Sequence, residues 1–174
     1  MGVTELFAIC ALSRRFDVRR LYDCEADTQA VFELYQSNPQ YFDAMKDCPT
    51  IEGAKADLTA LPPNKTNEDK YYLGFYADTA LVAVMDLILG FPNDKTAFIG
   101  LFMVNAKYQN KGIGSLIITE VLEALSDSGF AYCRLGYVKN NLQSRSFWEK
   151  NGFMPTGVTS EQEHYTIVMM QKDI

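Results

Sequence analysis

A glycine-containing turn past the middle of the chain constrains the fold most strongly. It joins an apolar run at 97–104 to a helical pattern at 112–128 and reads Gln109-Asn110-Lys111-Gly112-Ile113-Gly114. Glycine lacks the Cβ atom that would hold an anion away from the backbone, and the first turn of a helix supplies unpaired N–H groups and positive dipole. The turn and the following Ser115 therefore predict a phosphate-binding site, with an ordinary structural turn as the alternative.

Two other phosphate motifs do not fit these residues. A Walker loop has Gly-Lys followed by Ser or Thr, whereas here Lys111 precedes Gly112. A dinucleotide-binding turn has three glycines early in a strand–helix–strand unit and an acidic residue about 20 positions later. Only two glycines fit, and the turn lies past mid-chain. The sequence therefore argues against a nucleotide triphosphatase and against a dinucleotide-binding protein.

A second motif at 141–153 follows a β-rich run at 131–138. Asn141 stands where a helix would begin and is a natural N-cap. The two motifs together resemble the GNAT superfamily of acyl-CoA-dependent N-acyltransferases, whose patterns are Q/R-x-x-G-x-G/A and, later, N-x-x-A/S-x-x-x-Y-x-x-x-G-F. The resemblance covers roughly residues 73–170, and the matching positions are Val104, Gln109, Gly112, Gly114, Asn141, Ser144, Gly152 and Phe153.

The resemblance implies an α/β (mixed α+β) fold of the GNAT type. Its twisted mixed sheet has six to seven strands, helices on both faces, and a parallel strand pair, 97–104 and 131–138, that splays apart. Hydrophobic periodicity predicts strands at 16–21, 71–76, 81–89, 97–104, 131–138, 154–161 and 165–171. We expect helices from Asp23 or Asp27 through Tyr35, after Pro39, from Thr50 to before Pro62, and at 112–128 and 143–151.

The implied cofactor is acetyl-CoA, with coenzyme A leaving as the co-product. Splayed strands leave backbone groups unpaired, so pantetheine can pair with the strand end as a surrogate strand. The expected cofactor-binding residues are Phe102, Met103, Val104, Gln109, Asn110, Lys111, Gly112, Ile113, Gly114, Ser115, Asn141, Ser144, Phe147 and Trp148.

The proton donor and acceptor of the reaction are less determined. Many relatives protonate the departing thiolate with the Tyr of the second motif, but Trp148 stands there, and an indole N–H is not a practical acid. Three alternatives stay open: Tyr137 substitutes, the thiolate leaves unaided, or the protein binds acyl-CoA without efficient catalysis. Asp86 interrupts an apolar run and is the first choice for the base, or else a satisfied structural acceptor. Glu120, on the helix after the turn, is expected to be a solvated surface residue.

The expected activity is transfer of an acetyl group to a primary amine by direct attack in a ternary complex. The acceptor is a small-molecule amine or a peptide or protein amine, and Tyr41, Phe42, Asp86 and Tyr165 are the expected acceptor-binding residues. The alternative function is a catalytically weak acyl-CoA-binding or sensing protein. A homodimer is possible.

Composition limits the remaining function classes. A net charge of −6 opposes nucleic-acid binding and favours a cationic amine. No segment is long and apolar enough to span a bilayer, so we expect a cytoplasmic protein. Four scattered cysteines and one histidine argue against a metal site, and each cysteine is expected to be buried. Length and composition predict a single domain. The resemblance implies that this N-acetyltransferase domain spans 16–174 and that an extension of uncertain role at 1–15 precedes it.

Overall fold

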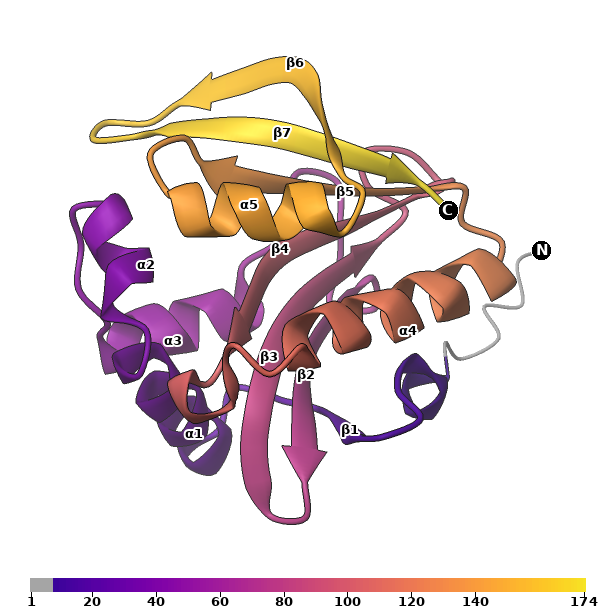
Figure 1. The fold of residues 1–174 in the computed structure, drawn as a ribbon. Coiled ribbons are helices and arrows are strands. Elements are labelled where there is room, and N and C mark those ends of the chain that lie inside the picture. Colours follow the sequence, from indigo (N-terminus) through magenta and orange to yellow (C-terminus); the bar gives the residue numbers. More distant parts are fainter. Residues whose placement is uncertain (1–7) are drawn as a thin grey trace.

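The computed structural model describes residues 8–174, and residues 1–7 of the predicted extension lie outside the described residues. One seven-stranded sheet has the order β1-β2-β3-β4-β5-β7-β6 (Figure 1). Its strands are β1 (Asp17–Arg20), β2 (Lys70–Ala77), β3 (Ala80–Leu89), β4 (Thr96–Val104), β5 (Tyr132–Val138), β6 (Met154–Glu161) and β7 (Thr166–Asp173). Only β4 and β5 are parallel neighbours in the described chain. The predicted fold class is confirmed.

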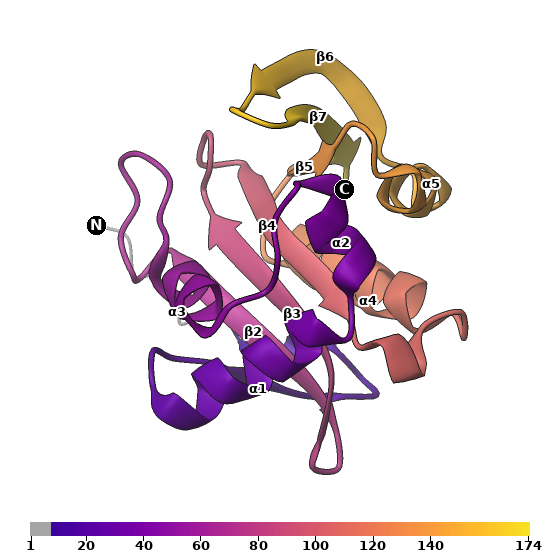
Figure 2. The same ribbon diagram turned by 90° about the vertical axis from the view of Figure 1, so that its left-hand side faces the viewer.

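Helices cover both faces of this sheet. They are α1 (Glu25–Gln36), α2 (Pro39–Ala44), α3 (Ile51–Thr59), α4 (Ile113–Asp127) and α5 (Leu142–Lys150), with short 3-10 turns η1 (Ile9–Leu12) and η2 (Ala106–Tyr108). Figure 2 shows α1, α2 and α3 on the face opposite to α4 and α5. No helix within residues 8–174 is both long and apolar enough to cross a membrane.

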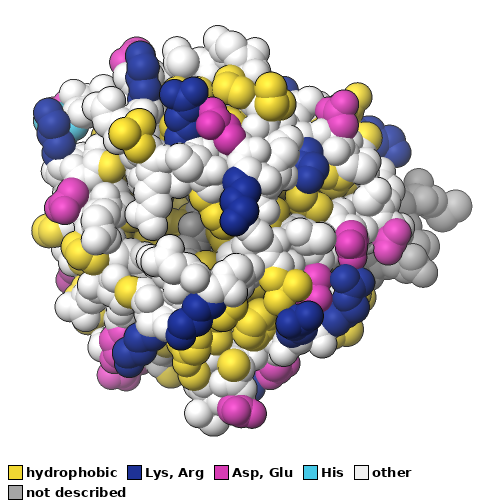
Figure 3. Space-filling model, viewed as in Figure 1, with side chains coloured by type: hydrophobic (Ala, Val, Ile, Leu, Met, Phe, Trp, Pro, Cys, Tyr) yellow, Lys and Arg dark blue, Asp and Glu magenta, His cyan; other side chains and the backbone are white. Residues whose placement is uncertain are grey.

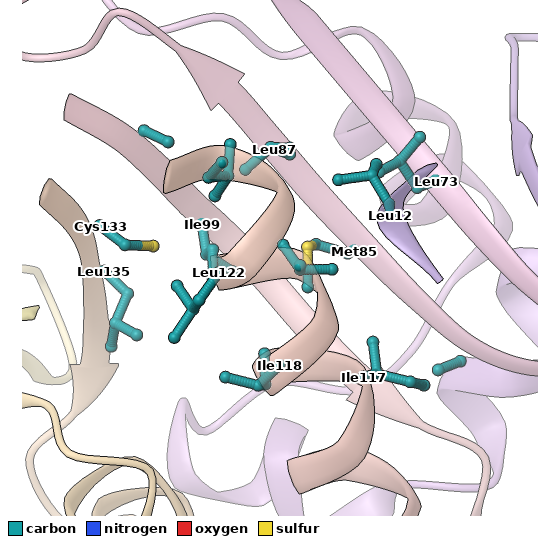
Figure 4. Packing of buried hydrophobic residues seen from close by; sticks show 14 of the residues in the cluster. Leu12, Leu73, Met85, Leu87, Ile99, Ile117, Ile118, Leu122, Cys133 and Leu135 are labelled. Atoms are coloured by element: carbon teal, nitrogen blue, oxygen red, sulfur yellow. The ribbon is translucent and has the colours of Figure 1, made fainter. Parts of the chain in front are cut away.

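Alternation along β2 and β3 divides the core into two halves. Leu73 and Met85 point to the α4 face, where they pack with Ile117 and with Leu12 of η1 (Figure 4). Tyr72 and the other alternate residues point to the α1 and α3 face. The period of two along a strand is the physical reason why one strand supplies both halves.

The parallel strands β4 and β5 separate after four residue pairs. Their pairing runs from Thr96 opposite Tyr132 to Ile99 opposite Leu135, and the outer parts of both strands have no ladder partner on that side. On its other edge, β4 has a bulge: the register with β3 shifts between Asp86 and Leu87, which leaves Gly100 without an opposite residue. A bulge bends and twists a strand locally. The predicted splayed pair is therefore present, with Gly100 where the strands part.

Of the three expected helix caps, Thr50 and Asn141 are confirmed and the cap of α1 is not. Thr50 accepts a hydrogen bond from the Gly53 N–H at 2.9 Å and caps α3 as predicted. The prediction that Asp23 or Asp27 caps α1 is wrong, because Cys24 occupies the N-cap position. Asp27 lies inside the first turn, where its carboxylate accepts from the Tyr22 N–H before the helix, at 2.8 Å.

Glu120 corrects another expectation. Its side chain is only 4% exposed, and it accepts hydrogen bonds from the Ser13 hydroxyl at 2.7 Å and the Arg14 N–H at 3.0 Å. Burial alone would raise the pKa of Glu120, but these hydrogen bonds and the Arg14 charge outweigh it and hold the pKa below its ordinary value. Glu120 is therefore not a solvated surface residue. It fastens the part of the N-terminal segment at 8–15 to α4.

The cysteines also differ from expectation. Cys133 is buried in the core beneath α4, as predicted. Cys10, Cys24 and Cys48 are exposed, so the expectation of burial is wrong for these three. Each lies in or beside a short connecting segment rather than in a strand, and connections run over the surface.

Candidate functional site

A cleft of about 300 Å³ opens where β4 and β5 part. The space-filling view shows a hollow with hydrophobic side chains on its floor and Lys and Arg side chains around it (Figure 3). All but two of the expected cofactor residues line the cleft: Phe102, Met103, Val104, Gln109, Asn110, Gly112, Gly114, Ser115, Asn141, Ser144, Phe147 and Trp148. Lys111 and Ile113 do not line it. The Lys111 ammonium donates to the Lys107 carbonyl, and Ile113 packs against the core.

The glycine turn ends the cleft on the α4 side. Gly112 is the N-cap of α4 with φ +77°, a left-handed conformation that glycine adopts without strain, and the space where its Cβ would lie is empty for 4 Å. The N–H groups of Ile113, Gly114 and Ser115 have no hydrogen-bond partner within residues 8–174. Unpaired N–H groups at the start of a 15-residue helix favour an anion.

A network of side-chain amides joins this turn to β4 and α1. The Gln109 amide donates to the Asn38 side-chain oxygen at 2.6 Å and to the Val104 carbonyl at 2.8 Å. Asn38 in turn donates to the same Val104 carbonyl at 3.1 Å. Sequence reasoning missed Asn38, because no local pattern marks a residue whose partners lie about 70 positions away. The network holds the turn against the open end of β4.

The same network limits which backbone groups of β4 remain available. The Val104 carbonyl already accepts hydrogen bonds from the side chains of Asn38 and Gln109. The backbone N–H of Asn105 donates to the Val82 carbonyl of β3. Backbone groups alternate between the two edges of a strand, so Phe102 faces the open edge with Val104, and Met103 faces β3. The backbone of Phe102 and the N–H of Val104 are therefore the groups of this strand end that a bound chain can pair with.

Helix α5 forms the opposite wall. The Asn141 side chain accepts from the Ser144 N–H at 3.0 Å, which is the predicted N-cap. Ser144, Phe147 and Trp148 share the helix face that borders the cleft. Trp148 is 5% exposed, and its ring packs 4.9 Å from Phe147 and 5.2 Å from Phe153 between centroids. No hydrogen bond from its indole N–H is formed within the described residues.

A second cavity, of about 270 Å³, lies on the other side of the β4 bulge. Tyr41 borders both cavities, and Gly100 and Leu101 on this cavity's wall directly precede Phe102 of the cleft. Of the expected acceptor residues, Tyr41, Phe42 and Asp86 line it. The two cavities therefore meet at Tyr41 and at the point where the strands part.

Asp86 lines the second cavity, and one of its carboxylate oxygens is engaged in an ion pair. Its Oδ1 accepts from the Lys70 ammonium at 2.7 Å, and Lys70 is only 3% exposed. A Cβ atom on Gly100 would lie 2.8 Å from Oδ2, so the carboxylate occupies the space that a side chain at position 100 would fill. Burial raises the pKa of Asp86, while the Lys70 charge acts in the opposite direction. A carboxylate with a raised pKa in a cavity is a typical proton acceptor.

Two expected site residues lie elsewhere. Tyr137 is buried in the core on the α4 face and borders neither cavity. It points to this face because it stands two residues after Leu135, which is also in this core. Tyr165 borders neither cavity, although it is close enough to Tyr41 to contribute to the raised pKa of that phenol, after burial and the Asp57 charge. Within residues 8–174, no three His, Cys, Asp or Glu side chains are placed to hold a metal ion.

Comparison with known families decides the classification. A model of the acetyltransferase (GNAT) family matches residues 17–153. The chain belongs to this family. The GNAT match begins with β1 and ends at Phe153, so it includes the glycine turn and the whole cleft.

Individual GNAT relatives are distant. The spermidine N(1)-acetyltransferase of Thermoplasma acidophilum is 28% identical over 96 residues, a match that covers 55% of this chain and 58% of that enzyme. The chain thus matches little more than half the length of this relative. The acceptor of this chain therefore does not follow from the name of this relative.

Solved GNAT structures share the fold. An acetyltransferase from Thermus thermophilus superposes with a TM-score of 0.70 and 17% identity, over 91% of this chain and 97% of that chain. The PaiA N-acetyltransferase of Thermoplasma acidophilum, solved with coenzyme A, gives 0.66 and 20%, over 91% and 99%. A ribosomal-protein-alanine N-acetyltransferase from Brucella melitensis gives 0.63 and 16%, over 91% and 99%.

Proposed function

We propose that this GNAT chain transfers an acetyl group from acetyl-CoA to a primary amine by direct attack in a ternary complex. The observation that carries the proposal is the cleft between splayed β4 and β5, which ends at three unpaired N–H groups of α4. The diphosphate of coenzyme A would bind at Gly112–Ser115, and its pantetheine would pair with the backbone of Phe102. The thioester would then lie near Gly100, where the cleft meets the second cavity.

Asp86 is the proposed proton acceptor. The amine nitrogen attacks the thioester carbonyl carbon, the C–S bond breaks, and the nitrogen loses a proton to the free Oδ2 of Asp86. The ion pair with Lys70 holds the other oxygen, which fixes the carboxylate at the bulge. Because burial raises the pKa of Asp86, its ionised form takes up a proton more readily than an exposed carboxylate.

The thiolate would leave without a dedicated acid from this motif. Trp148 occupies the position of the usual Tyr, and Tyr137 lies outside both cavities. A thiol has a pKa of about 8.5, which already makes the thiolate a tolerable leaving group. Trp148 would therefore contribute packing area beside pantetheine rather than a proton.

Trp148→Phe is expected to retain activity, with kcat within about threefold of wild type, because the aromatic surface survives and only the N–H is lost. Thiol release per folded molecule measures the effect, and calorimetry checks coenzyme A affinity. Tyr137→Phe serves as the matched control, since it removes a hydroxyl from the core. A loss of about 100-fold in Trp148→Phe with intact affinity would show that the indole N–H takes part in the reaction.

The same missing acid favours a second candidate function. A GNAT cleft without a phenol at position 148 fits a protein that binds acyl-CoA and reacts slowly. The two candidates differ in turnover, not in cofactor affinity. Homodimer formation and a cytoplasmic location remain predictions.

The test is thiol release from acetyl-CoA across a panel of amines, combined with mass spectrometry of the acceptor. The distant relatives act on spermidine and on ribosomal-protein alanine by name, so the panel includes polyamines and peptides with a free N-terminal alanine. For an enzyme, we expect the acetylated amine to form at more than about 1 turnover per second. Tight coenzyme A binding with no acetylated product would instead support the acyl-CoA-binding alternative.

A further inference from the structure

The second cavity contains a carboxylate that the sequence did not suggest. Asp57 of α3 lines this cavity together with Asp86, on the opposite side of the sheet from α4. The Tyr35 hydroxyl donates to Asp57 Oδ2 at 2.7 Å and lies 2.7 Å from the Tyr72 hydroxyl. Both phenols are buried, so they fix the direction of the Asp57 side chain. Its Oδ1 has no hydrogen-bond partner within the described residues.

The charge of the cavity is one-sided. Asp47, Asp57 and Asp86 line it, and no Lys, Arg or His side chain does. Lys70 neutralises one carboxylate from outside the cavity, because it pairs with Asp86 without bordering the space. Two negative charges therefore remain for three carboxylates and one ammonium. A cavity with this balance of charges attracts cations.

Aromatic rings complete the wall. The ring of Phe42 lies 5.3 Å from that of Tyr35 and 5.2 Å from that of Tyr41 between centroids, and all three border the cavity. Ring faces attract ammonium groups, and their edges pack against methylene chains. Carboxylates combined with aromatic rings are the recognition elements for an alkylammonium ion.

Tyr41 borders both cavities, where an acceptor and the thioester would meet. Its hydroxyl has no hydrogen-bond partner within residues 8–174, although burial raises the pKa of the phenol and the nearby Asp57 charge raises it further. The side chain is half-buried, so its hydroxyl is free to donate to a bound ligand.

We propose that the acceptor of this chain is a small aliphatic diamine or polyamine, and that Asp57 is the residue that selects it. The reacting nitrogen lies at Asp86 beside the Gly100 bulge, and the distal ammonium pairs with Asp57 Oδ1 between the rings of Tyr35 and Tyr41. This inference rests on the proposed acetyl transfer and specifies its acceptor. A peptide N-terminus, which lacks a second ammonium at a fixed spacing, would use only half of the cavity.

The test compares linear α,ω-diamines of increasing chain length with monoamines of equal length. Asp57→Asn keeps an acceptor for Tyr35 and removes the charge, so kcat/KM for the best diamine is expected to fall about 10- to 100-fold through KM. Monoamine turnover is expected to change less than about threefold, because it does not use the distal site. Glu52→Gln is the matched control. It makes the same charge change on α3 but outside this cavity. In this variant, kcat/KM for the diamine and turnover of the monoamine are both expected to stay at their wild-type values.

Calorimetry of diamine binding to the coenzyme A complex distinguishes a failure of the acceptor assignment from a failure of the proposed acetyl transfer. Diamine binding that Asp57→Asn abolishes, without turnover of any amine, would support the cation site and refute the proposed acetyl transfer. Turnover of peptides or monoamines equal to that of diamines, unchanged in Asp57→Asn, would overturn the acceptor assignment and leave the acetyl transfer intact. If Asp57→Asn is poorly folded, Tyr35→Phe replaces it, since it releases Asp57 from its fixed direction. An unchanged diamine preference in that variant would also overturn the assignment.

Discussion

Gly112→Asp is expected to reduce coenzyme A affinity by at least about 100-fold while leaving the fold intact. The new carboxylate would stand beside the unpaired N–H groups of α4, and a like charge facing a diphosphate costs several kcal/mol. The fold survives because a Cβ atom at this position meets nothing within 4 Å. Asp tolerates the left-handed conformation at φ +77° better than most residues but is still strained there, so the melting temperature is expected to fall slightly.

Gly112→Asn is the matched control for this prediction. Asn and Asp tolerate the left-handed conformation at φ +77° to a similar degree, have nearly the same shape and differ in charge. Calorimetry with coenzyme A is therefore expected to show most of the affinity in the Asn variant. The deficit of the Asp variant is expected to shrink at high salt, because screening weakens exposed charges. Equal affinity of the Asp variant and wild type would show that the diphosphate does not bind at this turn.

Asp86→Asn is expected to lower kcat by about 10²- to 10⁴-fold with coenzyme A affinity unchanged, as for the loss of a general base. The pH dependence follows from the direction of the shift. Because the pKa of Asp86 is raised, the base is ionised only above that raised value, and the wild-type rate climbs as pH rises through it. The variant has no group to ionise there, so this limb of its rate profile is expected to be flat.

The same substitution leaves the buried Lys70 without its partner. Breaking a buried ion pair costs about 3–5 kcal/mol, so the Asp86→Asn variant is also expected to melt at a lower temperature. The double variant Lys70→Met/Asp86→Asn removes the unpaired charge and is expected to regain stability but not activity. Recovery of activity in the double variant would identify Asp86 as a structural partner of Lys70 and not as the base.

The strands and the residues that line the cleft could be predicted because their signals are local. Alternating residues mark β2 and β3, and the glycine turn with Asn141 places two helix starts at one cleft. Lys111 is among the expected cofactor-binding residues because it stands inside the turn. Its side chain instead reaches back to the Lys107 carbonyl, which only three-dimensional geometry can reveal.

Other contacts of the two cavities were harder to predict because they connect distant segments. Asn38 meets Gln109, and Asp57 meets the Tyr35 hydroxyl, across 71 and 22 positions respectively. Asp86 was recognisable as a carboxylate in an apolar strand, but its partner Lys70 was not. The prediction for Glu120 is wrong for a related reason. Its position on the helix predicts exposure to solvent, but a segment from the start of the chain covers it.

The close approach of Gly100 to Asp86 also limits how this chain can diverge. A Cβ at position 100 would lie 2.8 Å from the Asp86 carboxylate, so the two positions compete for one volume. A lineage that gains a side chain at position 100 must first lose or displace the carboxylate, and the reverse order is equally constrained. Gly100 and Asp86 are therefore expected to change together among homologues. A homologue with a bulky residue at the bulge is expected to lack a carboxylate in the place that Asp86 occupies here.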